Sequence, residues 1–271
     1  MPRTTLCLAA VLALVATAPL AGPVKNPMKA GETWTDLQYD VVGDAALRDG
    51  AALLELEAPV RAHDAATVPI ILRQLDTGAE ITAATVVLAE TPAPVAAVMG
   101  FGPGMAPLDF EMRVRVDQYS NVRVIAETGD GLHMTGRFVK ASGGCSAPAS
   151  RDPEVALAGM GEMRLRQFTD ASAPLMSTPR REAQIMIRHP NYSGLQRDQI
   201  THLFIPAHFI DHMEVWQGDE LLFTMDGGIS VSENPVFRFV YSDNGAPDLR
   251  VMATDTDGNR FESALPKSVG L

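Results

Sequence analysis

The chemistry that this sequence can offer centres on one cysteine. Cys145 stands in the run Ala141-Ser142-Gly143-Gly144-Cys145-Ser146-Ala147-Pro148-Ala149-Ser150. This run is small, polar and rich in Gly, Pro and Ser, a composition typical of a flexible linker. We therefore expect an exposed thiol on a mobile arm, with Gly143 and Gly144 as the swivel. An exposed thiolate attacks persulfides, disulfides and oxidised sulfur species.

The only other cysteine, Cys7, lies in the first segment of the chain. Arg3 is followed by a short apolar run, Leu6 to Ala16, and small residues come at Ala21-Gly22. This is the layout of a secretory signal peptide, and the run is too short to span a bilayer. We expect residues 1–22 to be removed and the mature protein to lie in the periplasm. Cys145 then has no internal disulfide partner, so it stays reactive or links two chains as a disulfide-bonded dimer.

Three histidines form the next cluster with chemical potential. His202, His208 and His212 lie close together, and the last two are four residues apart. That spacing suits a zinc site on a helix, but the surrounding residues are typical of a strand, so we predict no metal. His208 is instead expected to pack or form hydrogen bonds at a contact with the other domain or a partner. Asp255 to Arg260 resembles part of a calcium loop, yet it lacks the terminal Glu and is predicted to be a hairpin turn.

The elements that must position these residues are strands, because apolar and polar residues alternate between Gly, Pro, Asn and Asp turns. In the first stretch the predicted strands are Leu53–Glu57, Val68–Leu72, Ile81–Leu88, Phe110–Val116, Val122–Ala126 and Leu132–Val139. In the second they are Glu182–Arg188, Phe209–Gln217, Glu220–Met225, Val236–Val240, Asp248–Asp255 and Arg260–Ala264. Asp130-Gly131 signals a hairpin. Asp44 could cap a helix that starts near Ala45, and glycine-rich Gly100–Gly104 is predicted to be a loop.

The alternation predicts two all-β domains. Residues 23–141 and 162–271 form the two sandwich domains, and a flexible linker, residues 142–161, carries the cysteine between them. In Phe110–Val116 the pattern places Glu111, Arg113 and Arg115 together on the polar face.

Composition and missing motifs narrow the function. With 22 basic and 33 acidic residues, the chain has a net charge of −11, which makes it a poor ligand for nucleic acid or an anionic membrane. The sequence has no Cys-x-x-Cys-His haem site, no Gly-x-Ser-x-Gly elbow and no phosphate loop, and beyond the signal peptide it has no membrane span. We therefore expect no cofactor. Because no general base accompanies Cys145, the sequence favours a carrier over an enzyme.

Two sets of residues resemble known families. The run Gly129-Asp130-Gly131-Leu132-His133-Met134-Thr135-Gly136-Arg137-Phe138-Val139-Lys140, followed by Gly143-Gly144-Cys145, resembles the end of SoxY, the sulfur-carrying subunit of bacterial sulfur oxidation. The second half resembles its partner SoxZ, through Arg188-His189-Pro190, Ser193-Gly194-Leu195, Ile205-Pro206-Ala207-His208-Phe209-Ile210, Asn234-Pro235, Phe237-Arg238-Phe239 and Asp257-Gly258-Asn259. The whole looks like the single-chain SoxYZ-like carriers associated with quinoprotein dehydrogenases.

This resemblance implies two immunoglobulin-like β-sandwiches and a covalent carrier of thiosulfonate or persulfide on Cys145. It implies as partners a c-type cytochrome that couples thiosulfate to the cysteine, other sulfur-oxidising enzymes, and a quinoprotein dehydrogenase. The chain departs from the two-subunit family, in which the Gly-Gly-Cys arm ends the polypeptide; here Cys145 is followed by a second domain. An accessory or scaffold protein of a quinoprotein dehydrogenase, with an incidental thiol, is one alternative. A thiol-dependent enzyme or metal-delivery protein, which requires His208 or His212 near the sulfur, is another.

Overall fold

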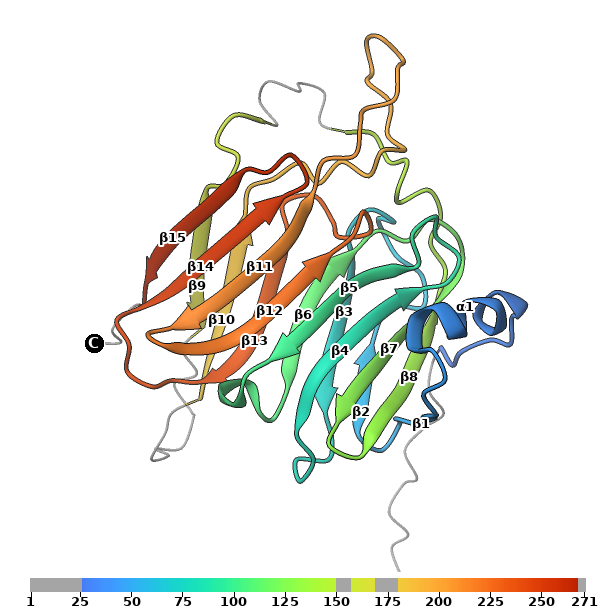
Figure 1. Cartoon of the computed structure of the whole chain (residues 1–271). Coiled ribbons are helices and arrows are strands. Elements are labelled where there is room, and N and C mark those ends of the chain that lie inside the picture. Colours follow the sequence, from blue (N-terminus) through green and yellow to red (C-terminus); the bar gives the residue numbers. More distant parts are fainter. Residues whose placement is uncertain (1–25, 150–156, 169–179, 268–271) are drawn as a thin grey trace, which may run out of the picture.

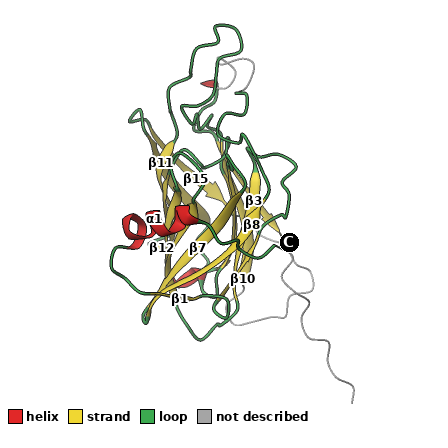
Figure 2. Cartoon of the chain, turned by 90° about the vertical axis from the view of Figure 1, so that its right-hand side faces the viewer, coloured by secondary structure: helices red, strands yellow, loops and turns green. Residues whose placement is uncertain are grey.

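The computed structural model describes residues 26–149, 157–168 and 180–267. Two β-sheets face each other as the layers of a long sandwich, and loops gather at one end of it (Figures 1 and 2). The all-β prediction is confirmed. The predicted signal peptide lies outside the described residues. Within those residues, no helix has the length and apolar character needed to cross a membrane.

The elements follow the order of the chain. The N-terminal half contains α1 (Glu32–Val42), β1 (Leu47–Asp49), β2 (Leu54–Glu57), β3 (Val68–Gln74), β4 (Ile81–Leu88), β5 (Val95–Phe101), the 3-10 turn η1 (Pro103–Met105), β6 (Asp109–Val114), β7 (Ser120–Thr128) and β8 (Gly131–Val139). The C-terminal half contains β9 (Met163–Phe168), β10 (Arg180–Ile187), β11 (Ile210–Gln217), β12 (Glu220–Gly227), β13 (Val236–Ser242), β14 (Asp248–Asp255) and β15 (Arg260–Pro266).

Each sheet runs through both halves of the chain. One sheet has nine strands in the order β1-β8-β7-β4-β5-β12-β11-β14-β15, and the other has six in the order β2-β3-β6-β13-β10-β9. The halves meet where β5 pairs with β12, from Ala97 opposite Gly227 to Phe101 opposite Phe223. In the smaller sheet β6 pairs with β13 through Phe110 and Phe239. The halves are therefore joined edge to edge into one continuous sandwich (Figure 1).

The core is also continuous across this junction. The ring centroids of Phe110 and Phe223 lie 5.1 Å apart, edge to face, and those of Phe223 and Phe239 are also 5.1 Å apart. All three side chains are at most 1% exposed. Aromatic pairs at this distance add about 0.5–1.5 kcal/mol each beyond the burial of their area. Residues from both halves thus form one hydrophobic core.

Two predictions about local structure are wrong. The glycine-rich stretch is only partly a loop, because Gly100 and Phe101 belong to β5. A Cβ on Gly102 would lie 2.0 Å from the carbonyl oxygen of Leu221, so this glycine permits the close approach of the two halves. The helix lies before Asp44 rather than after it: α1 ends at Val42, and its C-cap residue, Gly43, has a φ of 60°. The turns at Asp130-Gly131 and Asp255 to Arg260 are hairpins, as predicted.

Candidate functional site

Cys145 lies in the segment that leaves β8 at the loop end of the sandwich, beside the long orange loop of the C-terminal half (Figure 1). Its side chain is 0% exposed, whereas its neighbours Ser146 and Pro148 are exposed. The prediction of an exposed thiol on a free arm is therefore wrong for this conformation. The segment lies at the surface, but the cysteine points inward.

The two glycines serve packing rather than free rotation in this conformation. Gly143 has a φ of 77°, and its N–H donates to the carbonyl of Asp117 at 2.7 Å. A Cβ on Gly144 would lie 2.2 Å from the carbonyl oxygen of Ala65 and 2.7 Å from the backbone of Val116. Glycine is thus needed at one position for a left-handed backbone and at the next for close contact. The swivel predicted from composition is a tightly packed turn.

Side chains of the C-terminal half fasten this segment from the other side. The Ser193 hydroxyl donates to the carbonyl of Cys145. The Gln196 and Gln199 amides donate to the carbonyls of Ala147, at 3.0 Å, and Ala149, at 3.2 Å. The segment that was predicted to be a free linker is thus held by both halves, at least as far as Ala149. We call residues 143–149 the cysteine loop.

Arg115 is the fully buried charged residue next to the cysteine loop. It is 1% exposed, and its guanidinium donates to the carbonyls of Gly144 and Asn191, each at 3.3 Å. Among the described residues, its Nε has no hydrogen-bond partner and no carboxylate lies within ion-pair distance. Burial lowers the pKa of this guanidinium, which nevertheless stays protonated. The sequence pattern placed Arg115 on the polar face, but the cysteine loop covers it.

The surroundings of the thiol oppose its ionisation. Burial, together with the nearby Asp117 carboxylate, raises the pKa of Cys145 from an ordinary value of 9.0 to about 11, although Arg115 and the Ser230 hydroxyl act in the opposite direction. The Ser230 hydroxyl is fully buried and has no other hydrogen-bond partner among the described residues. The thiol is therefore neutral at physiological pH and a poor nucleophile while the cysteine loop is closed.

A hydrogen-bonded chain leads from this site into the C-terminal half. Asn191 Nδ2 donates to the carbonyl of Ser232 at 3.1 Å, and its backbone N–H donates to His189 Nδ1 at 3.0 Å. His189 Nε2 and His208 Nε2 lie 3.2 and 2.8 Å from the same Asp255 oxygen. Burial raises the pKa of Asp255, but hydrogen bonds from Asn259 and both histidines outweigh it and bring the pKa to about 2.

His208 was predicted to lie at a domain or partner contact. The contacts that the structure gives its side chain, with His189, Asp255 and Asp257, lie within the C-terminal half. His189, His208 and Asp255 are grouped closely enough to hold a metal ion. However, the two nitrogens that face Asp255 are placed as donors to it, and His189 Nδ1 accepts from Asn191. We therefore assign this cluster a structural role.

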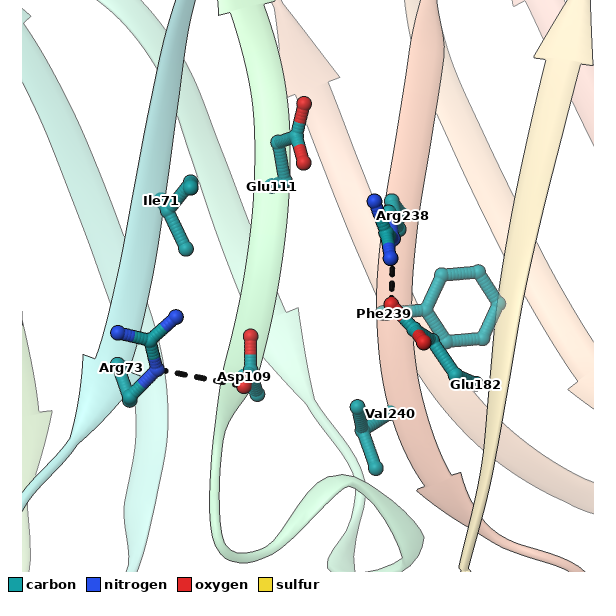
Figure 3. Close-up of a pocket in the computed structure, with 8 residues that line it drawn as sticks. All are labelled: Ile71, Arg73, Asp109, Glu111, Glu182, Arg238, Phe239 and Val240. Carbon is teal, nitrogen blue, oxygen red and sulfur yellow. Dashed lines mark hydrogen bonds and ion pairs between the residues drawn. The ribbon is translucent and has the colours of Figure 1, made fainter. Parts of the chain in front are cut away.

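Within the described part of the chain, His202, His212 and the surface pocket in Figure 3 suggest no second site. His202 has a φ of 59° in the loop before β11, while His212 on β11 bonds Asp226 and Glu214, at 2.6 and 3.3 Å. The pocket in Figure 3 crosses β3, β6, β13 and β10. Its charges pair with one another, Arg73 with Asp109 and Arg238 with Glu182, as is usual on an exposed sheet surface.

The fold and the site define a class of protein: an all-β chain of two joined halves, with a single described cysteine in the loop that follows the first half. Residues 38–145 match the family model of "Sulfur oxidation protein SoxY", and the match ends at Cys145. Residues 177–266 match that of "Sulphur oxidation protein SoxZ". The chain thus carries a SoxY domain and a SoxZ domain in one polypeptide, which confirms the predicted fusion and the order of its halves.

One solved structure similar to part of the chain is that of the sulfur carrier protein SoxY from Chlorobium limicola f thiosulfatophilum. It is 24% identical, covers 40% of this chain and 96% of its own, and has a TM-score of 0.34. No curated protein sequence matches the chain.

The sequence singled out Cys145, Gly143 and Gly144 as candidates but missed the residues that surround them. Arg115, Asp117, Asn191, Ser193 and Ser230 come from segments far apart in the chain. The sequence offered one signal for these residues. Arg115 stands between two apolar residues, Val114 and Val116, at the end of a predicted strand.

Proposed function

We propose that this protein is a periplasmic carrier, without catalytic activity of its own, that holds sulfur intermediates covalently on Cys145 and presents them to partner redox enzymes. The observation that supports this most directly is that the SoxY match ends at Cys145, which begins the connection to the SoxZ domain. Both matched families are described as sulfur oxidation proteins. The quinoprotein-associated type of fusion, with a quinoprotein dehydrogenase among its partners, is part of this proposal.

Loading with thiosulfate would form a bond between Sγ of Cys145 and the sulfane sulfur of thiosulfate. The thiol loses its proton, and two electrons pass to an oxidant, for which we propose a c-type cytochrome. The product is a thiosulfonate, Cys145–S–S–SO₃⁻. A partner hydrolase would then add water to the terminal sulfur, releasing sulfate and leaving a persulfide on the protein.

A carrier must expose its sulfur, so the buried thiol represents a closed resting position. The hydrogen bonds from Ser193, Gln196 and Gln199 to the cysteine loop contribute about 0.5–1.5 kcal/mol each, and Gln199 is exposed to competing water. Local opening of such a loop costs much less than unfolding the sandwich. We propose that a partner enzyme binds the open loop. The closed position protects the lone thiol from oxidation between turnovers.

The test is the intact mass of the full chain recovered from the periplasm of its own host, grown with thiosulfate, before and after treatment with reductant. We expect additions of sulfur or thiosulfonate that map to Cys145, that reductant removes, and that are absent from Cys145→Ser. The same cell fractionation tests the location, because the mature N-terminus reveals whether a signal peptide has been cleaved.

A bare thiol in the recovered protein, which also fails to load with thiosulfate and an oxidant, would refute the carrier. Retention of full sulfur-dependent or dehydrogenase activity in cells with Cys145→Ser would then indicate the scaffold role instead. Loss of that activity, with the variant still folded and present in normal amounts, would support the carrier.

A further inference from the structure

Among the described residues, no carboxylate lies within ion-pair distance of the cation next to the thiol, and Glu233 and Asp64 attract it only from farther away. Arg115 is 1% exposed, and among the described residues its guanidinium bonds two backbone carbonyls but no carboxylate. Burying an unpaired charge normally costs several kcal/mol. Since the thiol is neutral at physiological pH, it does not supply the missing negative charge. Such a site is complementary to an anion that arrives later.

A second polar group faces the same sulfur. The Ser230 hydroxyl is 0% exposed and has no other hydrogen-bond partner among the described residues, and the backbone N–H of Arg115 donates to the carbonyl of Ser230 at 2.7 Å. This backbone bond fixes the two residues beside each other. The guanidinium Nε has no hydrogen-bond partner among the described residues, and the Ser230 hydroxyl has none there besides the sulfur of Cys145, so both are buried donors beside the cysteine loop.

We propose that Arg115 and Ser230 form an anion-recognition site for the cargo, which binds the negative end of the sulfur adduct on Cys145 when the loop closes over it. The proposal rests on the proposed carrier function and deepens it. The ligand class is a singly charged sulfur adduct, such as a thiosulfonate or a persulfide anion. The unloaded thiol and neutral mixed disulfides lack the charge that the site recognises.

One carboxylate opposes this arrangement. Asp117 accepts a hydrogen bond from the N–H of Cys145 at 3.3 Å and disfavours negative charge on the sulfur. However, Asp117 is half-buried, so water screens its charge, whereas Arg115 is almost fully buried and is screened much less. Arg115 therefore has the stronger influence on an anion held inside the closed loop.

Tetrathionate provides a direct probe, because its reaction with a thiol needs no separate oxidant. The thiolate attacks one sulfane sulfur, the central S–S bond breaks, and thiosulfate leaves. The balance is protein–SH + S₄O₆²⁻ ⇌ protein–S–S–SO₃⁻ + S₂O₃²⁻ + H⁺. Intact mass at fixed ratios of tetrathionate to thiosulfate then gives the loading equilibrium. The matched neutral probe is hydroxyethyl disulfide with mercaptoethanol, which forms an uncharged adduct on the same sulfur.

We expect Arg115→Met to lower the thiosulfonate loading constant by about tenfold or more, because charge-assisted hydrogen bonds are worth at least about one factor of ten. The neutral disulfide should change by less than about twofold. Arg113→Met, an exposed arginine on β6 two residues away, is the matched control and should change neither equilibrium. Arg115→Lys keeps the charge, so its loading constant should lie between those of the wild type and Arg115→Met. Ser230→Ala should lower the loading constant by a smaller factor, and it serves as the test if Arg115→Met does not fold.

Three outcomes would overturn the inference. Equal losses for the charged and the neutral adduct in Arg115→Met would show a purely structural role. If the ratio of the thiosulfonate to the neutral-disulfide loading constant is the same in the Arg115 and Ser230 variants as in the wild type, neither residue recognises the charge. Failure of the wild-type protein to load tetrathionate sulfur, while it accepts the neutral disulfide, would exclude an anion site. None of these results touches the cellular test of the carrier, which depends on Cys145 and not on Arg115.

Discussion

Substitution of Gly144 by alanine should release the cysteine loop and activate the thiol. The new Cβ would lie 2.2 Å from the carbonyl oxygen of Ala65 and 2.7 Å from two backbone atoms of Val116, whereas real Cβ contacts stay above 3.0 Å. Backbone on both sides cannot yield as a flexible side chain would. The loop should therefore move, at the cost of the bonds that Gly144 makes with Val116, at 3.1 Å, and Arg115, at 3.3 Å.

The size of the expected rate increase follows from the pKa of the Cys145 thiol. Burial and Asp117 raise the pKa of Cys145 from 9.0 to about 11, and a difference of this size means about a hundredfold less thiolate in mildly alkaline buffer. A released loop restores an ordinary thiolate population and also gives the reagent access to the sulfur. Gly144→Ala should thus react with an aromatic disulfide at least about a hundredfold faster than the wild type.

The assay is the absorbance change when the aromatic disulfide reacts with folded protein, and the folded fraction is checked by urea unfolding. Gly129→Ala is the control, because a Cβ there meets nothing within 4 Å, and it should react as slowly as the wild type. If folded Gly144→Ala and the wild type react at the same rate, the close packing at Gly144 does not protect the thiol, and this reasoning is refuted.

Three further results are expected. In the wild type, the rate of thiol modification should keep rising with pH beyond 9 towards about 11, and the stability contributed by the neutral buried thiol should be fully present below pH 9 and lost as the pH rises through 11. Asp255→Asn should lower the free energy of unfolding by about 2–4 kcal/mol in urea, because His189 and His208 lose a charged acceptor. It should also remove the part of the wild-type acid sensitivity that appears as the pH falls from an ordinary Asp value of 3.8 through about 2. Asn191→Ala should be less stable than Asn191→Gly by about 1–2 kcal/mol, because the residue has a φ of 42°; equal stabilities would show that backbone strain is not decisive there.

The strands were predictable because their alternation is strong. In β10 and β13, every second side chain is apolar and faces the core, as Ile185 and Ile187 do in β10 and Phe237, Phe239 and Tyr241 do in β13. β5 was missed because its alanines and glycine have low strand propensity; they are favoured there because β5 is enclosed between β4 and β12, with Thr224 Oγ1 only 2.8 Å from a Cβ on Gly100.

The candidate site shows where composition fails. A Gly-Gly pair serves equally well in a mobile linker and in a turn packed against backbone, and only the neighbours decide between them. At Cys145 those neighbours are Arg115, Ser193 and Ser230, which are 30 to 85 positions away in the chain. A local pattern carries no information about such contacts. The sequence could single out Cys145 as the candidate attachment site, but it could not show that its thiol is covered.

The shared sheets have a consequence for how this protein behaves at low concentration. If the halves were separate chains, β5 and β6 on one and β12 and β13 on the other would be unpaired edge strands, which bind other strands indiscriminately. Their assembly would depend on protein concentration. Fusion makes the pairing of Phe110 with Phe239 and of Phe101 with Phe223 an event within one molecule. Dilution therefore cannot separate the halves, and every copy is made with its complement in equal amount.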